Sequence, residues 1–355
     1  MNTRQLHAAL GFAIIAALFL ATGANTAAPA PRKIVFLMDW IIGGKHAMFY
    51  PAIEKGYYQE EGLDVELRRG TGSDETVQAI DQGNADFGFA DAGVLALKVA
   101  QGAKVKYLGV VFDNQPLQFL ALKQSGIEAP KDFVGKTYGT ALASMSGALF
   151  PGFLRLNNID PAKVKMINVE IASTIPALFS QQIDVTAGYS NSGTAIAWAT
   201  AAKEGRDVVT IPAGQYGLDI YSNGIIVSDR LLDSDPEMVT KFMRATYRGL
   251  KYAVEHPSES LDMVFKLHPE IRTKDIATAQ FREALKDFLT ADAVENGLGH
   301  MNASKWQRTR DIIFEAYKVT EGIKAEELYT SKFLPVVKVE HTPKEFLETK
   351  VFGKY

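Results

Sequence analysis

The chain has 355 residues, more than one compact core holds and enough for two lobes. Its composition, 47% hydrophobic and 22% charged, is that of a globular protein, and its formal net charge of −3 includes no basic block. Nucleic acid is therefore not an expected partner. The absence of cysteine excludes disulfides, cysteine-bound metals and a lipid-carrying cysteine.

The first 28 residues have the composition of a secretory signal peptide. Arg4 makes the start positive, residues 8–20 are apolar, and residues 21–30 are small and rich in alanine. This order predicts cleavage after Ala24 or Ala28 and export to the periplasm without a lipid anchor. The alternative is an uncleaved membrane anchor, although the apolar run is short for a membrane span.

Strand-like and helix-like segments alternate from residue 33 onward. Short apolar runs predict strands at residues 34–38, 63–67, 85–90 and 105–112. Strands that alternate with helical patterns predict a mostly parallel sheet covered on both faces. The carboxyl ends of such strands are where ligands bind in open α/β sheets.

A second α/β series begins after a crossing strand at residues 117–123. Its strands are predicted at residues 135–141, 164–169, 185–189 and 208–212, and its helices at residues 147–157, 175–182 and 194–204. A return strand follows at residues 224–227. Helical spacing then dominates, at residues 236–255, 257–267, 274–289 and 303–319, the first of them after an Asp235-Pro236 start signal.

Two α/β lobes joined by two crossings, with a ligand cleft between them, form a type II periplasmic-binding-protein fold. The first lobe is expected to be discontinuous, residues 33–115 plus 224–340, and the second to comprise residues 116–223. Such proteins close on a ligand by hinge motion. The hinge candidates are residues 114–119 and 222–224, where Gly and Pro punctuate strand ends.

Loops after the first strands supply the first candidate ligand contacts. Trp40 and His46 follow the first strand; an indole can stack on a flat ligand, and a His can donate or accept a hydrogen bond. Ser73 and Asp74 follow the second strand, where free N–H groups suit an anion or a carbonyl. Asp91 ends the third strand and can accept from a ligand amine. The alternatives are a core Trp and ordinary helix caps.

The second lobe offers further candidate contacts. Ser144 and Ser146 open its first helix, where they either contact a ligand or cap the helix. Tyr189 and Asn191 end a strand, and Tyr189 is predicted to clamp a flat ring against Trp40. Asn114 lies near a crossing.

Roughly residues 33–330 resemble the NMT1/THI5-like group of solute-binding proteins, and the resemblance is strongest over residues 39–93. The resemblance rests on Trp40, His46, Ala52, Gly56-Tyr57, Glu61-Gly62-Leu63-Asp64-Val65, Gly72-Ser73, Gly83 and Ala85-Asp86-Phe87-Gly88. It implies the periplasmic component of an ABC importer and ligand contacts at Trp40 and His46. Most members carry Pro-Asn where this chain has Ile42-Gly43, and this difference concerns the choice of ligand.

The resemblance implies a binding protein without a cofactor, expected as a monomer, that delivers a small molecule to a permease coupled to an ATPase. A planar heteroaromatic nutrient such as a thiamine-pyrimidine precursor is the leading ligand; an aliphatic sulfonate or nitrate is the alternative. Acidic Asp39, Asp74 and Asp91 against a single basic Lys45 favour a neutral or amine-bearing ligand. An enzyme is disfavoured, because no catalytic motif is present and the pyrimidine-synthesising relatives use cysteines. A sensory binding protein that docks on a receptor is the third class.

Overall fold

The computed structural model describes residues 30–142, 144–320, 322–353 and 355. The candidate site lies in the compact unit formed by residues Lys33–Tyr355. The predicted signal peptide falls outside the described residues. Among the described helices, none combines the length and the apolar character that crossing a membrane requires.

The first sheet has five strands in the order β2-β1-β3-β10-β4. These are β1 (Arg32–Leu37), β2 (Leu63–Arg68), β3 (Phe87–Asp91), β4 (Val105–Val110) and β10 (Asn223–Ser228). Strands β1 and β3 are parallel, whereas β10 runs antiparallel to both β3 and β4. The chain returns from the second sheet at the end where β3 stops, so Asn223 pairs with Asp91.

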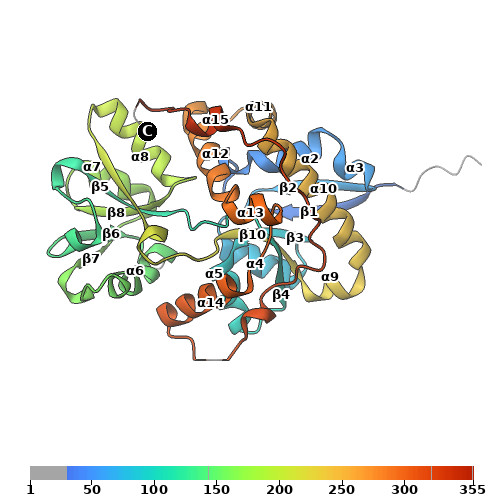
Figure 1. The fold of residues 1–355 in the computed structure, drawn as a ribbon, viewed down its shortest axis with the longest axis horizontal. Coiled ribbons are helices and arrows are strands. Elements are labelled where there is room, and N and C mark those ends of the chain that lie inside the picture. Colours follow the sequence, from blue (N-terminus) through green and yellow to red (C-terminus); the bar gives the residue numbers. More distant parts are fainter. Residues whose placement is uncertain (1–29, 143, 321, 354) are drawn as a thin grey trace, which may run out of the picture. The chain divides into compact units, whose positions relative to one another are not determined.

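Helices cover both faces of this sheet (Figure 1). They are η1 (Gly44–Phe49), α2 (Tyr50–Glu54), α3 (Tyr57–Glu60), α4 (Ser73–Gln82), α5 (Ala92–Ala100), α9 (Asp229–Ser234), α10 (Pro236–Glu255), α11 (Pro257–Leu267), α12 (Lys274–Phe288), α13 (Ala291–Asn296) and α14 (Ala303–Tyr317). Helix α10 packs through Phe242, whose ring stacks on Phe87 of β3 at 3.6 Å between centroids. The Asp235 side chain accepts from the Met238 N–H, as the predicted start signal requires.

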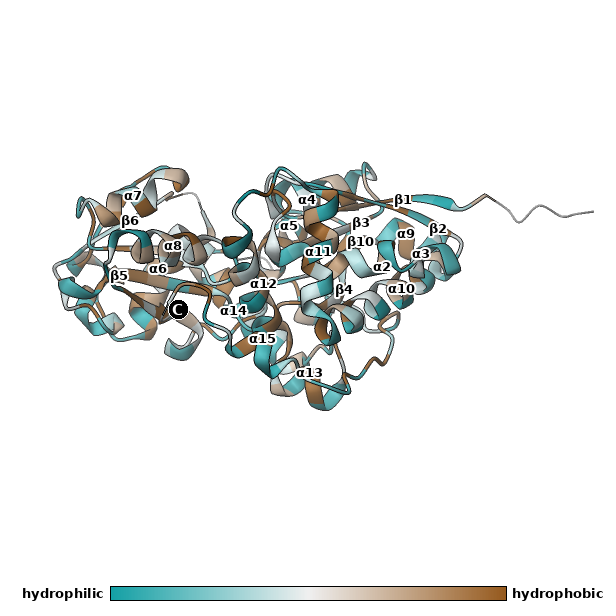
Figure 2. Ribbon diagram, turned by 90° about the horizontal axis from the view of Figure 1, so that it is seen from above, coloured by the Kyte–Doolittle hydropathy of each residue, from teal (hydrophilic) through white to brown (hydrophobic). Residues whose placement is uncertain are grey.

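The second sheet has five strands in the order β7-β6-β8-β5-β9. These are β5 (Leu117–Leu122), β6 (Thr137–Thr140), β7 (Lys165–Asn168), β8 (Val185–Tyr189) and β9 (Val208–Pro212). Its main helices are α6 (Met145–Leu156), α7 (Thr174–Phe179) and α8 (Gly193–Glu204), with the short turns η2 (Lys123–Ser125), η3 (Pro130–Phe133), η4 (Pro161–Lys163), η5 (Ile171–Ser173) and η6 (Ala213–Tyr216). Strand β5 runs antiparallel to β8 and β9 and is largely hydrophobic in Figure 2.

The observed strands overlap all ten predicted strands, and both sheets are α/β as expected. The sheets contain fewer parallel strand pairs than predicted. Strand β10 runs antiparallel to β3 and β4, and β5 runs antiparallel to β8 and β9. The first sheet takes its strands from residues 32–110 and 223–228, and the second from residues 117–212. The boundaries of lobes that move as rigid bodies stay a prediction.

The end of the chain runs from the first sheet's helices to the second sheet. Beyond η7 (Ala325–Glu327), helix α15 (Lys344–Glu348) lies beside α12 (Figure 1), and Arg282 donates to the Thr349 carbonyl. The Tyr355 hydroxyl bonds the N–H and the carbonyl of Val208, on the edge strand β9. Its ring stacks on Trp198 of α8 at 5.8 Å. Tyr355 therefore pairs the outward backbone groups of one residue on this edge strand.

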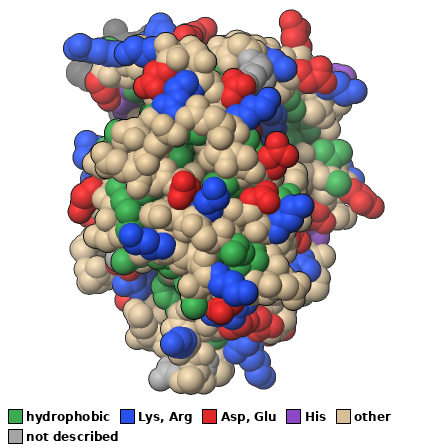
Figure 3. All heavy atoms as spheres, turned by 90° about the vertical axis from the view of Figure 1, so that its left-hand side faces the viewer, with side chains coloured by type: hydrophobic (Ala, Val, Ile, Leu, Met, Phe, Trp, Pro, Cys, Tyr) green, Lys and Arg blue, Asp and Glu red, His purple; other side chains and the backbone are tan. Residues whose placement is uncertain are grey.

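Charged side chains are mixed on the face that Figure 3 shows. Blue Lys and Arg groups alternate with red Asp and Glu groups there, without a continuous basic surface. Such a face lacks the electrostatic footprint of a nucleic-acid-binding surface.

Candidate functional site

A cavity of about 1420 Å³ is lined by residues of both sheets. On the side of the first sheet it is reached by the strand-end residues Asp39, Asp91 and Asn223. On the side of the second sheet it is reached by Tyr189 of β8 and by residues of α6, α7 and α8. Ligands bind at this place in α/β folds because loops after strand ends are free to carry functional side chains.

Asp39 is the centre of a buried polar network on the first-sheet wall. Its Oδ2 accepts from Lys45 Nζ at 2.5 Å and from Asn223 Nδ2 at 3.0 Å, and its Oδ1 lies 2.8 Å from His46 Nε2. Asp39, Lys45 and Asn223 line the cavity. The carboxylate and the ammonium neutralise each other, so this part of the wall is polar without net charge.

The pKa values of both Asp39 and His46 are shifted downward in this network. Burial alone opposes the charge on Asp39, but the Lys45 ammonium and hydrogen bonds from His46 and Lys45 outweigh it and hold the pKa of Asp39 well below its usual range. Burial also lowers the pKa of His46, a shift that Asp39 only partly offsets. The Gly43 N–H donates to His46 Nδ1 at 3.2 Å, so the neutral ring carries its proton on Nε2 and donates to Asp39.

Asp91 is both a helix cap and part of the cavity wall. Its Oδ1 accepts from the N–H groups of Gly93 at 2.8 Å and Val94 at 3.2 Å at the start of α5. The Ser222 hydroxyl donates to Oδ2 at 3.1 Å. Burial raises the pKa of Asp91 to about 6, against the lowering effect of these three donors. The carboxyl can therefore accept a ligand N–H when ionised, and it titrates close to neutral pH.

Among the aromatic residues that line the cavity, Trp40 and Tyr189 come from opposite sheets. Trp40 follows β1 and is 39% exposed, while Tyr189 ends β8 and is half-buried. The exposed fraction of Trp40 shows that it is not a core residue. The stacking of a flat ligand between the two rings stays a prediction.

Ser73 and Asp74 line the cavity at the start of α4. The N-cap of this helix is Gly72, so the alternative that Ser73 or Asp74 caps it is wrong. The Ser73 hydroxyl instead accepts from the Asp91 N–H at 3.1 Å and joins the two loops. Asp74 is exposed and pairs with Lys98 at 2.7 Å.

Ser144 and Ser146 line the cavity from the start of α6. Ser144 caps the helix by accepting from the Gly147 N–H, as the structural alternative proposed. Its hydroxyl also lies 2.9 Å from that of Ser146, which lies 3.0 Å from the Thr140 hydroxyl. Both serines thus belong to a hydroxyl cluster that is partly satisfied within the protein.

Three of the predicted contact residues do not line the cavity: His46, Asn114 and Asn191. His46 is fully buried behind Asp39. Asn191 is turned toward α12, where its amide donates to Asp287 Oδ2 at 2.9 Å. Asn114 is exposed, and only its backbone N–H is engaged, by the Asp287 carbonyl. Each lies near a strand end in sequence, but its side chain is directed elsewhere or lies outside the cavity.

The Gly43-Gly44 pair explains how His46 comes to lie behind the wall. The Gly44 N–H donates to Gln280 of α12 at 3.2 Å. A Cβ on Gly44 would lie 1.8 Å from the Ala277 carbonyl oxygen. Close packing of η1 on α12 therefore requires glycine at position 44 and fixes the direction of Lys45 and His46.

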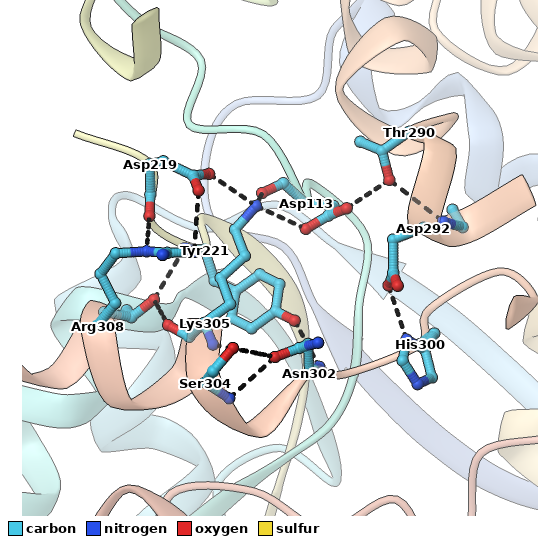
Figure 4. A network of polar contacts seen from close by, with 12 residues as sticks. Asp113, Asp219, Tyr221, Thr290, Asp292, His300, Asn302, Ser304, Lys305 and Arg308 are labelled. Atoms are coloured by element: carbon cyan, nitrogen blue, oxygen red, sulfur yellow. Dashed lines mark hydrogen bonds and ion pairs between the residues drawn. The ribbon is translucent and has the colours of Figure 1, made fainter. Parts of the chain in front are cut away.

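Lys305 of α14 connects the two chain crossings between the sheets (Figure 4). Its ammonium lies 2.8 Å from Asp113 Oδ1, on the first crossing, and 3.0 Å from Asp219 Oδ1, on the second. Arg308 adds an ion pair to Asp219 at 3.0 Å. The predicted hinge segments thus lie beside ion pairs that join the two crossings. Hinge motion itself stays a prediction.

The sequence predicted neither Asn223 as a cavity-lining residue nor the buried Ser222 as a hydrogen-bond donor to Asp91. Their position follows from the antiparallel insertion of β10, which places residue 223 opposite Asp91. No local motif marks them. Among the described residues, no group of three His, Cys, Asp or Glu side chains is arranged to hold a metal ion.

Relatives of the chain include binding proteins and a synthase. The riboflavin-binding protein RibY of Chloroflexus aurantiacus is 25% identical over 328 residues, 88% of this chain and 90% of that protein. The formylaminopyrimidine-binding protein of Halalkalibacterium halodurans is 24% identical over 90% of this chain and 96% of its own length. A 4-amino-5-hydroxymethyl-2-methylpyrimidine phosphate synthase of Legionella pneumophila is 24% identical over 85% of this chain and 92% of its own length.

Solved structures show the same fold. The periplasmic aliphatic sulphonate binding protein SsuA of Escherichia coli superposes with a TM-score of 0.65 at 13% identity, over 84% of this chain and 97% of that one. The α/β architecture is therefore that of periplasmic binding proteins, as the sequence predicted. A sequence model of the family described as NMT1/THI5 like matches residues 44–260. The match spans more than half of the chain, which belongs to the NMT1/THI5-like family.

Proposed function

We propose that this protein is the solute-binding component of an ABC importer and takes up a small planar heteroaromatic nutrient. The observation that carries the proposal is the cavity lined by two sheets, with Trp40 on one side and Tyr189 on the other. Aromatic faces favour flat partners, and a cavity between two α/β units suits binding that is coupled to closure.

The first-sheet wall supports a ligand edge with both donors and acceptors. Asp91 offers a carboxylate oxygen to a ligand N–H, and Lys45 lines the cavity with an ammonium that can donate to a carbonyl or ring nitrogen. Because Asp39 neutralises Lys45, the wall holds no spare positive charge for a sulfonate or nitrate. A thiamine-pyrimidine precursor is the leading candidate on these grounds, and another heteroaromatic nutrient comes second.

An enzyme is the second candidate, because two curated relatives, from Legionella pneumophila and Aspergillus parasiticus, are named 4-amino-5-hydroxymethyl-2-methylpyrimidine phosphate synthase. Against it stand the absence of cysteine from the sequence and the neutral, fully buried His46. His46 donates to Asp39 and does not line the cavity, so it is not placed to exchange protons with a substrate.

The deciding experiment is a thermal-shift screen of the purified protein from residue 29 onward, followed by calorimetric titration. Pyrimidines, flavins, aromatic acids, sulfonates and nitrate form the panel. Stoichiometric binding of a heteroaromatic compound without product, detected by mass spectrometry, supports the importer component. Turnover of the bound compound would establish the enzyme instead, and binding of sulfonates alone would reject a planar ligand.

The proposal also places the protein in the periplasm, as a monomer that hands its ligand to a permease and its ATPase. N-terminal sequencing of periplasmic material should give a start between residues 25 and 31. Retention of Met1 would contradict export with cleavage. Genes for a permease and an ATPase beside this one would separate an importer component from a sensory protein that docks on a receptor.

A further inference from the structure

We propose that the ligand has two parts: a polar heterocyclic head that binds the Asp39–Asp91 wall, and an uncharged apolar or aromatic extension that lies against η5, α7 and α8. This inference rests on the proposed binding function and narrows its substrate class. It predicts that a single pyrimidine ring fills only part of the cavity.

The size of the cavity is the first argument. Its volume of about 1420 Å³ exceeds the range of about 300–1000 Å³ that is usual for small-molecule sites. A ring stacked on Trp40 and hydrogen-bonded to Asp91 would occupy the first-sheet end. The space beside the second sheet would remain for another part of the same molecule.

The two ends of the cavity differ in polarity. The first-sheet wall carries the hydrogen-bonded side chains of Asp39, Lys45, Asp91 and Asn223. The second-sheet wall is also lined by polar residues such as Thr174, Ser180 and Thr200, but η5, α7 and α8 add a group of apolar side chains that we call the apolar segment. It consists of Ile171, Ala172, Ile175, Pro176, Phe179 and Ile196, and hydrophobic colour marks α7 in Figure 2.

Most of the apolar side chains of this segment are exposed, as is typical of a surface that binds an apolar group. Ile171 is 59% exposed and Ile196 is 45% exposed, and both line the cavity. Apolar surface gains free energy when it leaves water, and contiguous exposed apolar residues in a groove mark binding sites. The group that covers this segment is an apolar part of the same ligand whose polar head binds the Asp39–Asp91 wall.

The ion pairs formed by cavity-lining residues favour an uncharged extension. Glu204 lines the cavity and lies 3.5 Å from Arg206, and Asp74 lies 2.7 Å from Lys98, which also lines it. Each carboxylate at the rim therefore has its own cation. A charged extension would have to compete with these pairs, whereas an aromatic or alkyl group would not.

Matched probe pairs test the inference by calorimetry. The first pair is 4-amino-5-hydroxymethyl-2-methylpyrimidine and its benzyl ether; the second is uracil and lumichrome, which adds two fused rings to the same pyrimidinedione edge. In at least one pair, the extended probe should bind roughly tenfold more tightly or better, because a buried aromatic ring removes a large apolar area from water. Equal affinity within both pairs would overturn the inference and leave the proposed function standing. Absence of binding by all heteroaromatic probes would overturn the proposed function itself.

The substitution Ile196→Ala tests whether the ligand extension contacts Ile196. The variant should weaken the extended probe about 5- to 20-fold and leave the single ring unchanged, since it removes apolar contact only beyond the head. Leu267→Ala is the matched control: Leu267 is 42% exposed at the end of α11 and does not line the cavity, so neither probe should change. Equal weakening of both probes by Ile196→Ala would show that Ile196 serves lobe closure, and would refute the inference. Unchanged thermal unfolding without ligand excludes misfolding as the cause.

Discussion

The two walls of the cavity differ in the polarity and the burial of their side chains. The first-sheet wall is a network of buried polar groups in which Asp39 and Asp91 each have several hydrogen-bond partners. The wall of η5, α7 and α8 presents Ile171 and Ile196 to solvent. The polar groups of the first wall are therefore satisfied within the protein's own fold, whereas the second wall leaves apolar side chains open to solvent.

This difference separates stability from affinity. A side chain in the buried network should cost folding free energy when it is removed, because its partners are left unsatisfied in a dry environment. An exposed apolar side chain should cost little in the free protein and more in the complex. Substitutions on the two walls should therefore have different effects on stability and on affinity.

The largest effect is expected for Asp39→Ala. The substitution leaves the Lys45 ammonium buried without its counter-charge and removes the acceptor of Asn223 and His46. Breaking a buried pair in this way costs about 3–5 kcal/mol of unfolding free energy. Chemical denaturation measures it. The double substitution Asp39→Ala with Lys45→Met should recover part of the loss; a double variant as unstable as the single one would show that the charge pair is not the cause.

Asp91→Asn should change how stability depends on pH. The folded-state pKa of about 6 lies above the ordinary value for Asp, so the folded protein holds a proton that the unfolded chain has lost between pH 4 and 6. The stabilising contribution of this proton is complete below about pH 4 and disappears as the pH rises through 6. At about 1.4 kcal/mol per pKa unit, the total is about 3 kcal/mol at most.

The variant lacks this titration, so its unfolding free energy should fall less than that of the parent between pH 4 and 7. Asp74→Asn, which neutralises an exposed carboxylate at the same cavity, should keep the parental slope. If Asp91→Asn and the parent have superimposable stability–pH curves, Asp91 does not titrate in this range.

The substitution Trp40→Ala tests whether the exposed indole on the first-sheet wall stacks on the ligand. Loss of a stacked indole should weaken binding of a heteroaromatic ligand by about 1–3 kcal/mol, roughly 5- to 150-fold in affinity. The free protein should unfold almost as before, because Trp40 is already 39% exposed. Calorimetric titration and thermal denaturation of the same sample give both numbers. A large drop in melting temperature with parental affinity would instead show that the indole stabilises the free protein and does not contact the ligand.

Ile171→Ala should have the smallest effect on the free protein. Ile171 is 59% exposed, and exposed substitutions usually change the unfolding free energy by no more than about 0.5 kcal/mol. Denaturant unfolding without ligand measures the change. A loss of 2 kcal/mol or more would mean that η5 packs as tightly as the Asp39 wall, and the contrast between the two walls would fail.

Much of this architecture follows from local sequence. The ten strands could be located because short apolar runs bounded by Gly, Pro and polar residues leave few other structures. Trp40, Asp91 and Tyr189 could be placed at the cavity because each comes at or just after a strand end. Asp235-Pro236 marked the start of α10 because capping depends on residues only three apart.

Tertiary structure alone decided which polar groups meet. Asn223 joins Asp39 only because β10 returns antiparallel beside β3, more than 180 residues after β1 along the chain. His46 lies behind the wall because Gly44 lets η1 approach α12. Asp91 caps a helix and lines the cavity at once, a pair of roles that a sequence motif presents as alternatives. Hydrogen bonds between distant segments depend on strand order and side-chain direction, and neither quantity is encoded in the local periodicity that predicts helices and strands.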